Sequence, residues 1–275
     1  MTGVDASLPT GVTLHAEVSG AGDPVLLIAG TGCDHRFWEL QVREYAKRWT
    51  VIAIDARGSG RSTVPKDVES YTSEVMADDV AALLRHLDVG PAHLAGHSLG
   101  SCVAQQIAIR HADVVRSLQL HATWARADEW LKRAFIGTTR YPLERGDNHA
   151  TFRTVMMWML SATYLETRQP DEVAEMVRYC FIDNPHLHAN EGMLGHLHAD
   201  AVHDTREALP GLAVPTLVTA GEMDYLIPAR YGAATTDLIP GARWHLFEGE
   251  RSTHGLNWEM VDDFNRVTLE FMRTV

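Results

Sequence analysis

The chain has 275 residues, 45 % of them hydrophobic, so it is long enough to bury a sizeable core. Its formal net charge of −12 argues against a nucleic-acid partner, because binding phosphates requires clustered Lys and Arg. The first residues, MTGVDASLPTG, lack the basic start and apolar stretch of a signal peptide, and the apolar run VMMWML is too short to span a bilayer. We therefore expect a cytoplasmic protein with no membrane partner.

Apolar runs of strand length recur along the chain and alternate with helical patterns. In chain order they are VTLHAEV, PVLLIAG, TVIAIDA, AHLAG and SLQLHA, then, after a long gap, PTLVTAG and ARWHLFEG. Continuous apolar runs are typical of strands buried on both faces, and helices between them indicate a mostly parallel sheet with right-handed crossovers. The first run, VTLHAEV, is expected at the edge of this sheet.

Helices are predicted at FWELQVREYAKRW, SEVMADDVAALLRHL, SCVAQQIAIRHA and NWEMVDDFNRVTLEFMRTV. In several of them apolar residues recur three and four positions apart, opposite charged residues. Between residues 123 and 210 the pattern changes to amphipathic helical segments rich in Trp, Met, Phe and Tyr, including DEVAEMVRYCFI, with no strand between them. We expect an α/β fold whose core comprises residues 1–122 and 211–275, with a helical cap at 123–210 over one end of the sheet.

The segment Gly96-His97-Ser98-Leu99-Gly100 fits G-x-S-x-G, the nucleophile elbow, in which a sharp turn lifts a serine above the end of a sheet. The pattern alone arises by chance in about one chain in ten of this length. Its context is more specific, because it follows the apolar run AHLA and opens a helix that starts with small residues. Ser98 is therefore the candidate nucleophile.

With this motif in this context, the chain resembles the α/β-hydrolase family from about Val12 to the C-terminus, with residues 123–210 in the place of that family's cap. The resemblance implies a triad in the order Ser, acid, His. Asp224 in PTLVTAGEMDYLIP occupies the position of the acid, and Glu222 is its rival. His254 in FEGERSTHGLNWEM occupies the position of the base, on the loop before the last helix.

These three residue types are needed together because a serine hydroxyl is a poor nucleophile at neutral pH. His254 would take its proton, while Asp224 would fix the ring's tautomer. The developing oxyanion would bind the backbone N–H of Leu99 and, by resemblance, that of Thr31 in the loop AGTG, where the family often has a histidine in place of Ala29. The hydroxyl of Thr31 is a candidate third donor.

The substrate pocket is expected above Ser98. Its candidate lining residues are Gly30, His97, Trp124, Met157 and Trp158. A second interpretation of these residues is structural: His97 supports the elbow, and the Trp and Met side chains pack the core of the cap. Flexible Met and flat aromatic groups around a pocket favour an apolar or cyclic acyl substrate.

Two further motifs are expected to be structural. The segment IDARGSGRS, with Asp55 and Arg57, lacks any nucleotide-binding pattern and is read as a turn. The His-rich tract from His186 to His203 does not place its ligands on one helical face, so we expect a hinge of the cap rather than a metal site. The three cysteines are far apart and odd in number, which favours reduced thiols. No metal and no cofactor are predicted.

The leading hypothesis is a cofactor-free serine hydrolase that cleaves a carboxylic ester, lactone or thioester of a small-molecule substrate. The segments LIAGTGCDHRFW, IDARGSGRS and PTLVTAGEMDYLIP resemble those of enol-lactonases of aromatic catabolism and methylesterases of polyketide tailoring. Two alternatives stay open: an enzyme that uses the same triad for C–C bond cleavage, acyl transfer or cyclisation, and a ligand receptor with a vestigial triad. A homodimer is also left open.

Overall fold

The computed structural model of the chain describes residues 2–167 and 190–275. An eight-stranded sheet with the order β1-β2-β4-β3-β5-β6-β7-β8 forms its centre. The strands are β1 (Thr2–Ser7), β2 (Thr13–Ser19), β3 (Pro24–Ile28), β4 (Thr50–Asp55), β5 (Ala92–His97), β6 (Val115–His121), β7 (Thr216–Gly221) and β8 (Arg243–Phe247). Neighbouring strands from β4 to β8 pair in parallel, so the predicted mostly parallel sheet is confirmed.

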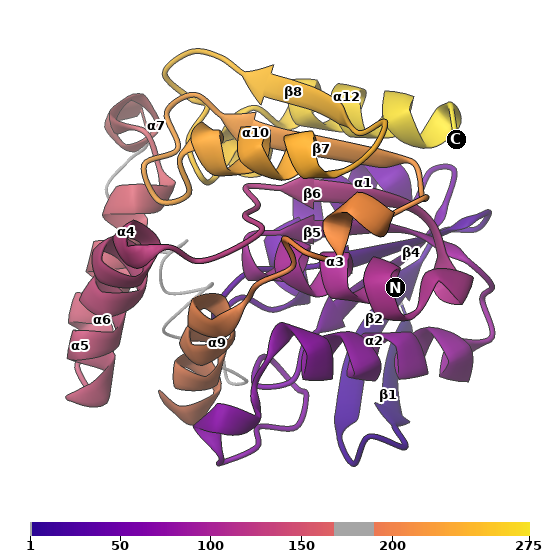
Figure 1. Cartoon of the computed structure of the whole chain (residues 1–275), viewed down its shortest axis with the longest axis horizontal. Coiled ribbons are helices and arrows are strands. Elements are labelled where there is room, and N and C mark those ends of the chain that lie inside the picture. Colours follow the sequence, from indigo (N-terminus) through magenta and orange to yellow (C-terminus); the bar gives the residue numbers. More distant parts are fainter. Residues whose placement is uncertain (1, 168–189) are drawn as a thin grey trace.

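Helices cover both faces of this sheet (Figure 1). They include α1 (Glu39–Tyr45), α2 (Ser73–Leu87), α3 (Leu99–Arg110), α10 (Ala229–Leu238), α11 (Leu256–Glu259) and α12 (Val261–Arg273). Helix α1 packs against α12, and α2 packs against α3. Helix α2 begins where the hydroxyl of Thr72 accepts the amide of Val75, and it ends at Asp88 in the left-handed conformation.

One edge of the sheet differs from the sequence prediction. The run VTLHAEV forms β2, which lies inside the sheet between β1 and β4, so its expected place at the edge was wrong. The edge strand is β1, of which only Ala6 is buried. Because β1 buries one side chain, its sequence carries little of the apolar signal by which a strand is recognised.

The chain between β6 and β7 forms helices in the part that the structure describes. They are α4 (Glu129–Leu131), a π-helical turn (Lys132–Gly137), α5 (Thr138–Glu144), α6 (Asn148–Met159), α7 (Ala162–Thr167) and α9 (Asn190–Val202). Figure 1 shows α4 to α7 grouped at the end of the molecule toward which the arrowheads of β7 and β8 point. The predicted helix DEVAEMVRYCFI, with Cys180, and the histidines His186 and His188 lie outside the described residues. None of the described helices is long and apolar enough to cross a membrane.

The turn from β5 into α3 is crowded by the strand beside it. A Cβ added to Gly100 would lie 2.2 Å from the carbonyl oxygen of Ile28 and 2.6 Å from that of Ala29. Both obstacles are backbone atoms, which cannot move aside as the end of a flexible side chain can. The second glycine of the elbow therefore lets α3 begin directly against the end of β3.

We predict that Gly100→Ala lowers the free energy of unfolding by about 3 kcal/mol or more, because the added methyl group must displace backbone. Gly211→Ala is the matched control, since a Cβ there meets nothing within 4 Å and the residue has no positive φ. That control should change stability by less than about 1 kcal/mol. Urea unfolding of both variants measures the difference, and equal stability for the two would contradict the account.

Candidate active site

Ser98 lies in a strained turn between β5 and α3. Its backbone has φ 55° and ψ −125°, a conformation that residues with a side chain seldom adopt. Its amide donates to the carbonyl of His121 (2.9 Å), which fixes the turn to the end of β6. A Cβ on Gly96 would lie 2.2 Å from the carbonyl oxygen of Gly100, so both glycines of the motif are required by the same tight turn.

Asp224 and His254 form a buried pair. His254 Nδ1 lies 2.8 Å from Asp224 Oδ2, and both side chains are almost completely shielded from solvent. The other carboxylate oxygen, Oδ1, accepts the amides of Leu226 (2.9 Å) and Ile227 (2.8 Å). These bonds hold the carboxylate in one orientation, so His254 is positioned with Nδ1 toward the acid and Nε2 turned away from it.

Glu222, the rival acid, has another role. Its side chain is exposed, and Oε2 accepts the amide of Gly249 at 3.0 Å. This bond joins the loop after β7 to the loop after β8. Of the two carboxylates after β7, the structure therefore brings Asp224, and not Glu222, to His254.

His97 supports the loop that carries His254. Its Nε2 donates to the main-chain carbonyl of His254 at 2.9 Å, and the two rings pack edge to face at 4.6 Å. Burial, and then the neighbouring His254, hold the pKa of His97 well below its usual value, so its ring stays neutral. The structural interpretation of His97 therefore fits better than a place in the pocket.

The described residues form no hydrogen bond between Ser98 Oγ and the His254 ring. Such bonds are often long in ligand-free enzymes and tighten when substrate binds. The bond from His97 nevertheless ties the residue directly before Ser98 to the backbone of His254. The segments that carry Ser98 and His254 are therefore held next to each other.

The loop after β3 passes directly beside Ser98. A Cβ on Gly30 would lie 3.0 Å from Ser98 Cβ and 3.5 Å from Ser98 Oγ. The amides of Gly32 and Cys33 in this loop already bond to other groups, whereas the Thr31 amide has no acceptor among the described residues. Leu99 is the first residue of α3, so its N–H has no partner within the helix.

The side chain of Thr31 does not match its expected role. Its hydroxyl donates to Asp200 Oδ2 at 2.7 Å, so in this arrangement it does not offer a third oxyanion donor. The prediction overlooked Asp200, a buried carboxyl group on α9. The two residues are 169 positions apart, and no local pattern in the sequence links them.

A second buried carboxylate, Glu259, joins the His254 loop to the helical segment between β6 and β7. Glu259 accepts the amide of Ser161 (2.9 Å), also bonds to its hydroxyl, and accepts the hydroxyl of Thr253 (2.6 Å). The amide of Gly255 donates to the carbonyl of Met159 at 2.8 Å. The residues on both sides of His254 are thus bonded to the junction between α6 and α7.

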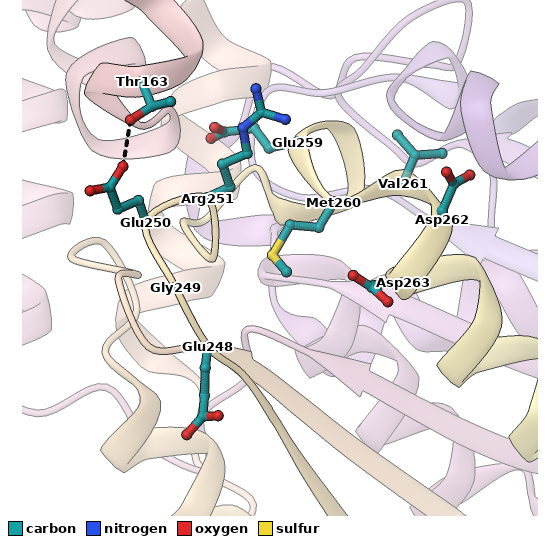
Figure 2. Close-up of a pocket in the computed structure, with 10 residues that line it drawn as sticks. All are labelled: Thr163, Glu248, Gly249, Glu250, Arg251, Glu259, Met260, Val261, Asp262 and Asp263. Atoms are coloured by element: carbon teal, nitrogen blue, oxygen red, sulfur yellow. Dashed lines mark hydrogen bonds between the residues drawn. The ribbon is translucent and has the colours of Figure 1, made fainter.

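A cavity of about 620 Å³ lies beside this junction (Figure 2). Across it the hydroxyl of Thr163 donates to Glu250 at 2.7 Å. Its lining contains five carboxylates and one guanidinium, and does not include Ser98, Asp224 or His254. This cavity is therefore distinct from the site around Ser98.

Trp124, Met157 and Trp158, which were expected to line the pocket, differ in burial. Met157 is 74 % exposed, so the structure does not enclose it in a pocket. Trp124 is fully buried, and its ring lies edge-on to that of His203. Trp158 is half-buried and packs against the hydrophobic core. Trp124 thus fits the structural interpretation, in which these side chains pack the core.

The turn IDARGSGRS is built from buried charged groups. Asp55 accepts the amides of His35 and Arg61, both at 2.8 Å, and Arg57 forms two hydrogen bonds to Asp79. Burial alone would raise the pKa of Asp55, but these bonds and the one from the His35 ring hold it below its usual value. Both charged side chains are occupied by protein groups, which supports a structural turn.

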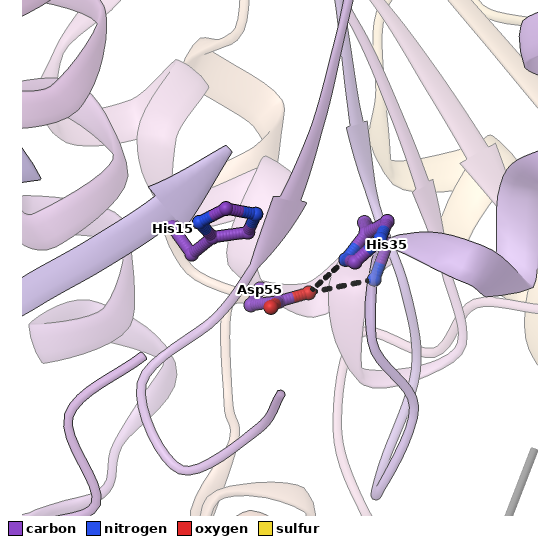
Figure 3. Close-up of side chains that lie close together, drawn as sticks. All are labelled: His15, His35 and Asp55. Carbon is purple, nitrogen blue, oxygen red and sulfur yellow. Dashed lines mark hydrogen bonds and ion pairs between the residues drawn. The ribbon is translucent and has the colours of Figure 1, made fainter. Parts of the chain in front are cut away.

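His15, His35 and Asp55 lie close enough together to suggest a metal site (Figure 3). Both ring nitrogens of His15 and both carboxylate oxygens of Asp55 already have protein partners, however. His35 Nδ1 lies 2.7 Å from Asp55 Oδ1, and His15 Nδ1 lies 2.6 Å from Asp5 Oδ1. The guanidinium of Arg61 reaches His15 Nε2 at 3.4 Å, where it would repel a cation. Hydrogen bonding therefore accounts for this cluster.

Comparison with known proteins places this geometry in context. The model of the alpha/beta hydrolase fold family matches residues 23–254. A protein named "Putative carbamate hydrolase RutD" from Azorhizobium caulinodans is 32 % identical over 261 residues, which cover 94 % of each chain. The crystal structure of the enol-lactonase from Burkholderia xenovorans LB400 matches with a TM-score of 0.86 and 28 % identity, over 98 % of this chain and 100 % of that one. A thermophilic esterase from Thermogutta terrifontis matches with a TM-score of 0.85 and 28 % identity, over 100 % and 99 %.

We predict that Asp224→Asn lowers kcat about 10⁴-fold, because an amide at this position favours the wrong tautomer of His254. Glu222→Gln is the matched control, since it removes a nearby charge without touching the histidine, and it should change kcat less than about threefold. Steady-state kinetics with an activated ester measure both. A larger loss in the Glu222 variant would reverse the assignment of the acid.

Proposed function

The chain belongs to the alpha/beta hydrolase fold family and is an enzyme of the hydrolase class, and from this premise we propose that it cleaves a carboxylic ester, lactone or thioester through an acyl-enzyme on Ser98. The observation that carries the proposal is the buried Asp224–His254 pair, together with the strained turn that holds Ser98. Hydrogen bonds from His97 and to Glu259 hold the loop that carries His254.

In the proposed reaction, Ser98 Oγ attacks the carbonyl carbon of the substrate and His254 Nε2 takes its proton. Asp224 keeps the proton on Nδ1 and stabilises the imidazolium. The negative charge on the carbonyl oxygen is stabilised by the N–H groups of Leu99 and Thr31. His254 then protonates the leaving group, and a water molecule, with His254 as base, releases the acid and restores Ser98.

The substrate class proposed is an apolar or cyclic acyl compound. A solved structure that is similar over almost the whole chain is titled an enol-lactonase, and another is titled an esterase. A carbamate is the second candidate, because the relative that is 32 % identical is named for its cleavage. All three bonds are attacked at a carbonyl carbon, so the same triad and the same two N–H groups would serve each of them.

We predict that a fluorophosphonate probe labels Ser98 and that p-nitrophenyl esters turn over, with the acyl chain length of the best ester reporting the size of the pocket. Ser98→Ala should lose the label and at least about 10³-fold in kcat. Ser7→Ala, which changes an exposed serine on β1, is the control and should keep both. Labelling of the Ser98 variant equal to that of the wild type would refute the assignment of the nucleophile.

A further inference from the structure

One face of helix α9 contacts the loop after β3 that contains Thr31 and Gly32, which we call the oxyanion loop. Met193, His196 and Asp200 are spaced three and four residues apart, so their side chains lie along the same side of the helix. The sulfur of Met193 lies 2.3 Å from where a Cβ on Gly32 would be. The Gly32 amide donates to His196 Nδ1 (3.1 Å), and the opposite ring nitrogen of His196 donates to a main-chain carbonyl (2.7 Å).

Asp200 is the third contact and the least expected one. Its side chain is completely buried, Oδ2 accepts the hydroxyl of Thr31 at 2.7 Å, and Oδ1 has no partner among the described residues. An ionised carboxylate in such a place lacks the hydrogen bonds that normally compensate for its burial. The neutral acid does not carry this cost, and the Thr31 hydroxyl can still donate to it.

We propose that Asp200 is a positioning residue that fixes Thr31, and with it the oxyanion loop, and that it performs this role as the uncharged acid. The proposal rests on the proposed function, because the loop matters only if the Thr31 amide stabilises an oxyanion. Ionisation of Asp200 places a buried negative charge beside the loop where negative charge develops in the transition state. It therefore opposes the reaction without altering any group that touches the substrate.

Three buried titratable groups on the same or an adjoining element do not change charge near neutral pH. They are Cys102 from α3, His196 from α9, and His203, which directly follows α9. Burial raises the pKa of the Cys102 thiol well above its usual value, and burial lowers the pKa of both histidines to about 4. Burial raises the pKa of Asp200 to about 7, against a smaller opposite effect of the Thr31 bond. Within this set, only Asp200 titrates between pH 5.5 and 8.5.

The test compares Asp200→Asn with the wild type, using p-nitrophenyl esters at pH 5.5 to 8.5 and active sites counted with the fluorophosphonate probe. The amide has the shape of the acid but cannot ionise. The ratio of kcat for the variant to kcat for the wild type should rise about tenfold across this range, because only the wild type acquires the charge. The ratio of KM values should stay constant. The oxyanion develops only in the transition state, so the charge on Asp200 should affect kcat and not the binding of the uncharged ester.

Asp204→Asn is the matched control, because it removes an exposed carboxylate four residues further along the chain, and its ratio should not depend on pH. A ratio for Asp200→Asn that is also independent of pH would overturn the proposal. If the wild type neither reacts with the probe nor turns over, the proposed function fails. An active wild type with a constant ratio removes only the role of Asp200.

Thr31→Val provides a second variant that leaves the buried carboxyl group in place. At pH 5.5, where Asp200 is uncharged, loss of the hydroxyl should lower kcat about tenfold with little change in KM, because Thr31 is no longer fixed to Asp200. An unchanged kcat in Thr31→Val would contradict the coupling between these residues.

Discussion

Backbone crowding around Ser98 is the constraint on which the rest of the site depends. Atoms of β3 lie where Gly100 would carry a side chain, and Ser98 itself adopts a conformation that side chains disfavour. The surrounding structure must hold this strain, and the bond from the Ser98 amide to the end of β6 is one way in which it does so. The same crowding brings Gly30 against Ser98, so the turn that carries the proposed nucleophile lies directly beside the loop proposed to bind the oxyanion.

The partners of Ser98 come from distant parts of the chain, and buried polar groups hold them in place. His97 and Glu259 anchor the loop of His254, while His196 and Asp200 anchor the loop of Thr31. Glu259 and Asp200 differ in one respect. Glu259 accepts several hydrogen bonds, whereas Asp200 accepts one, and its other oxygen has no partner within residues 2–167 and 190–275. In surroundings like those of Asp200, where burial is not compensated by several hydrogen bonds, a carboxyl group is more stable neutral than charged.

Much of this could be predicted from the sequence, because the signals were local. The apolar runs located seven of the eight strands, and the elbow and the loops after β7 and β8 supplied Ser98, Asp224 and His254 in the family's order. Strand β1 was not predicted, because only one of its side chains is buried and its sequence therefore lacks an apolar run. Asp200 and Glu259 were missed for another reason. Asp200 bonds to Thr31, 169 residues away, and the bond of Glu259 to Ser161 spans 98 residues, and over such separations sequence spacing carries no information.

The most direct test of the central claim is to find the acyl group on the enzyme. After rapid mixing with p-nitrophenyl acetate and acid quenching, intact-protein mass spectrometry should detect one added acetyl group, and peptide mapping should place it on Ser98. The burst of p-nitrophenolate should match the fraction of enzyme acylated. Turnover without any acetylated enzyme, or an acetyl group on another residue in enzyme that turns over at full rate, would contradict the account.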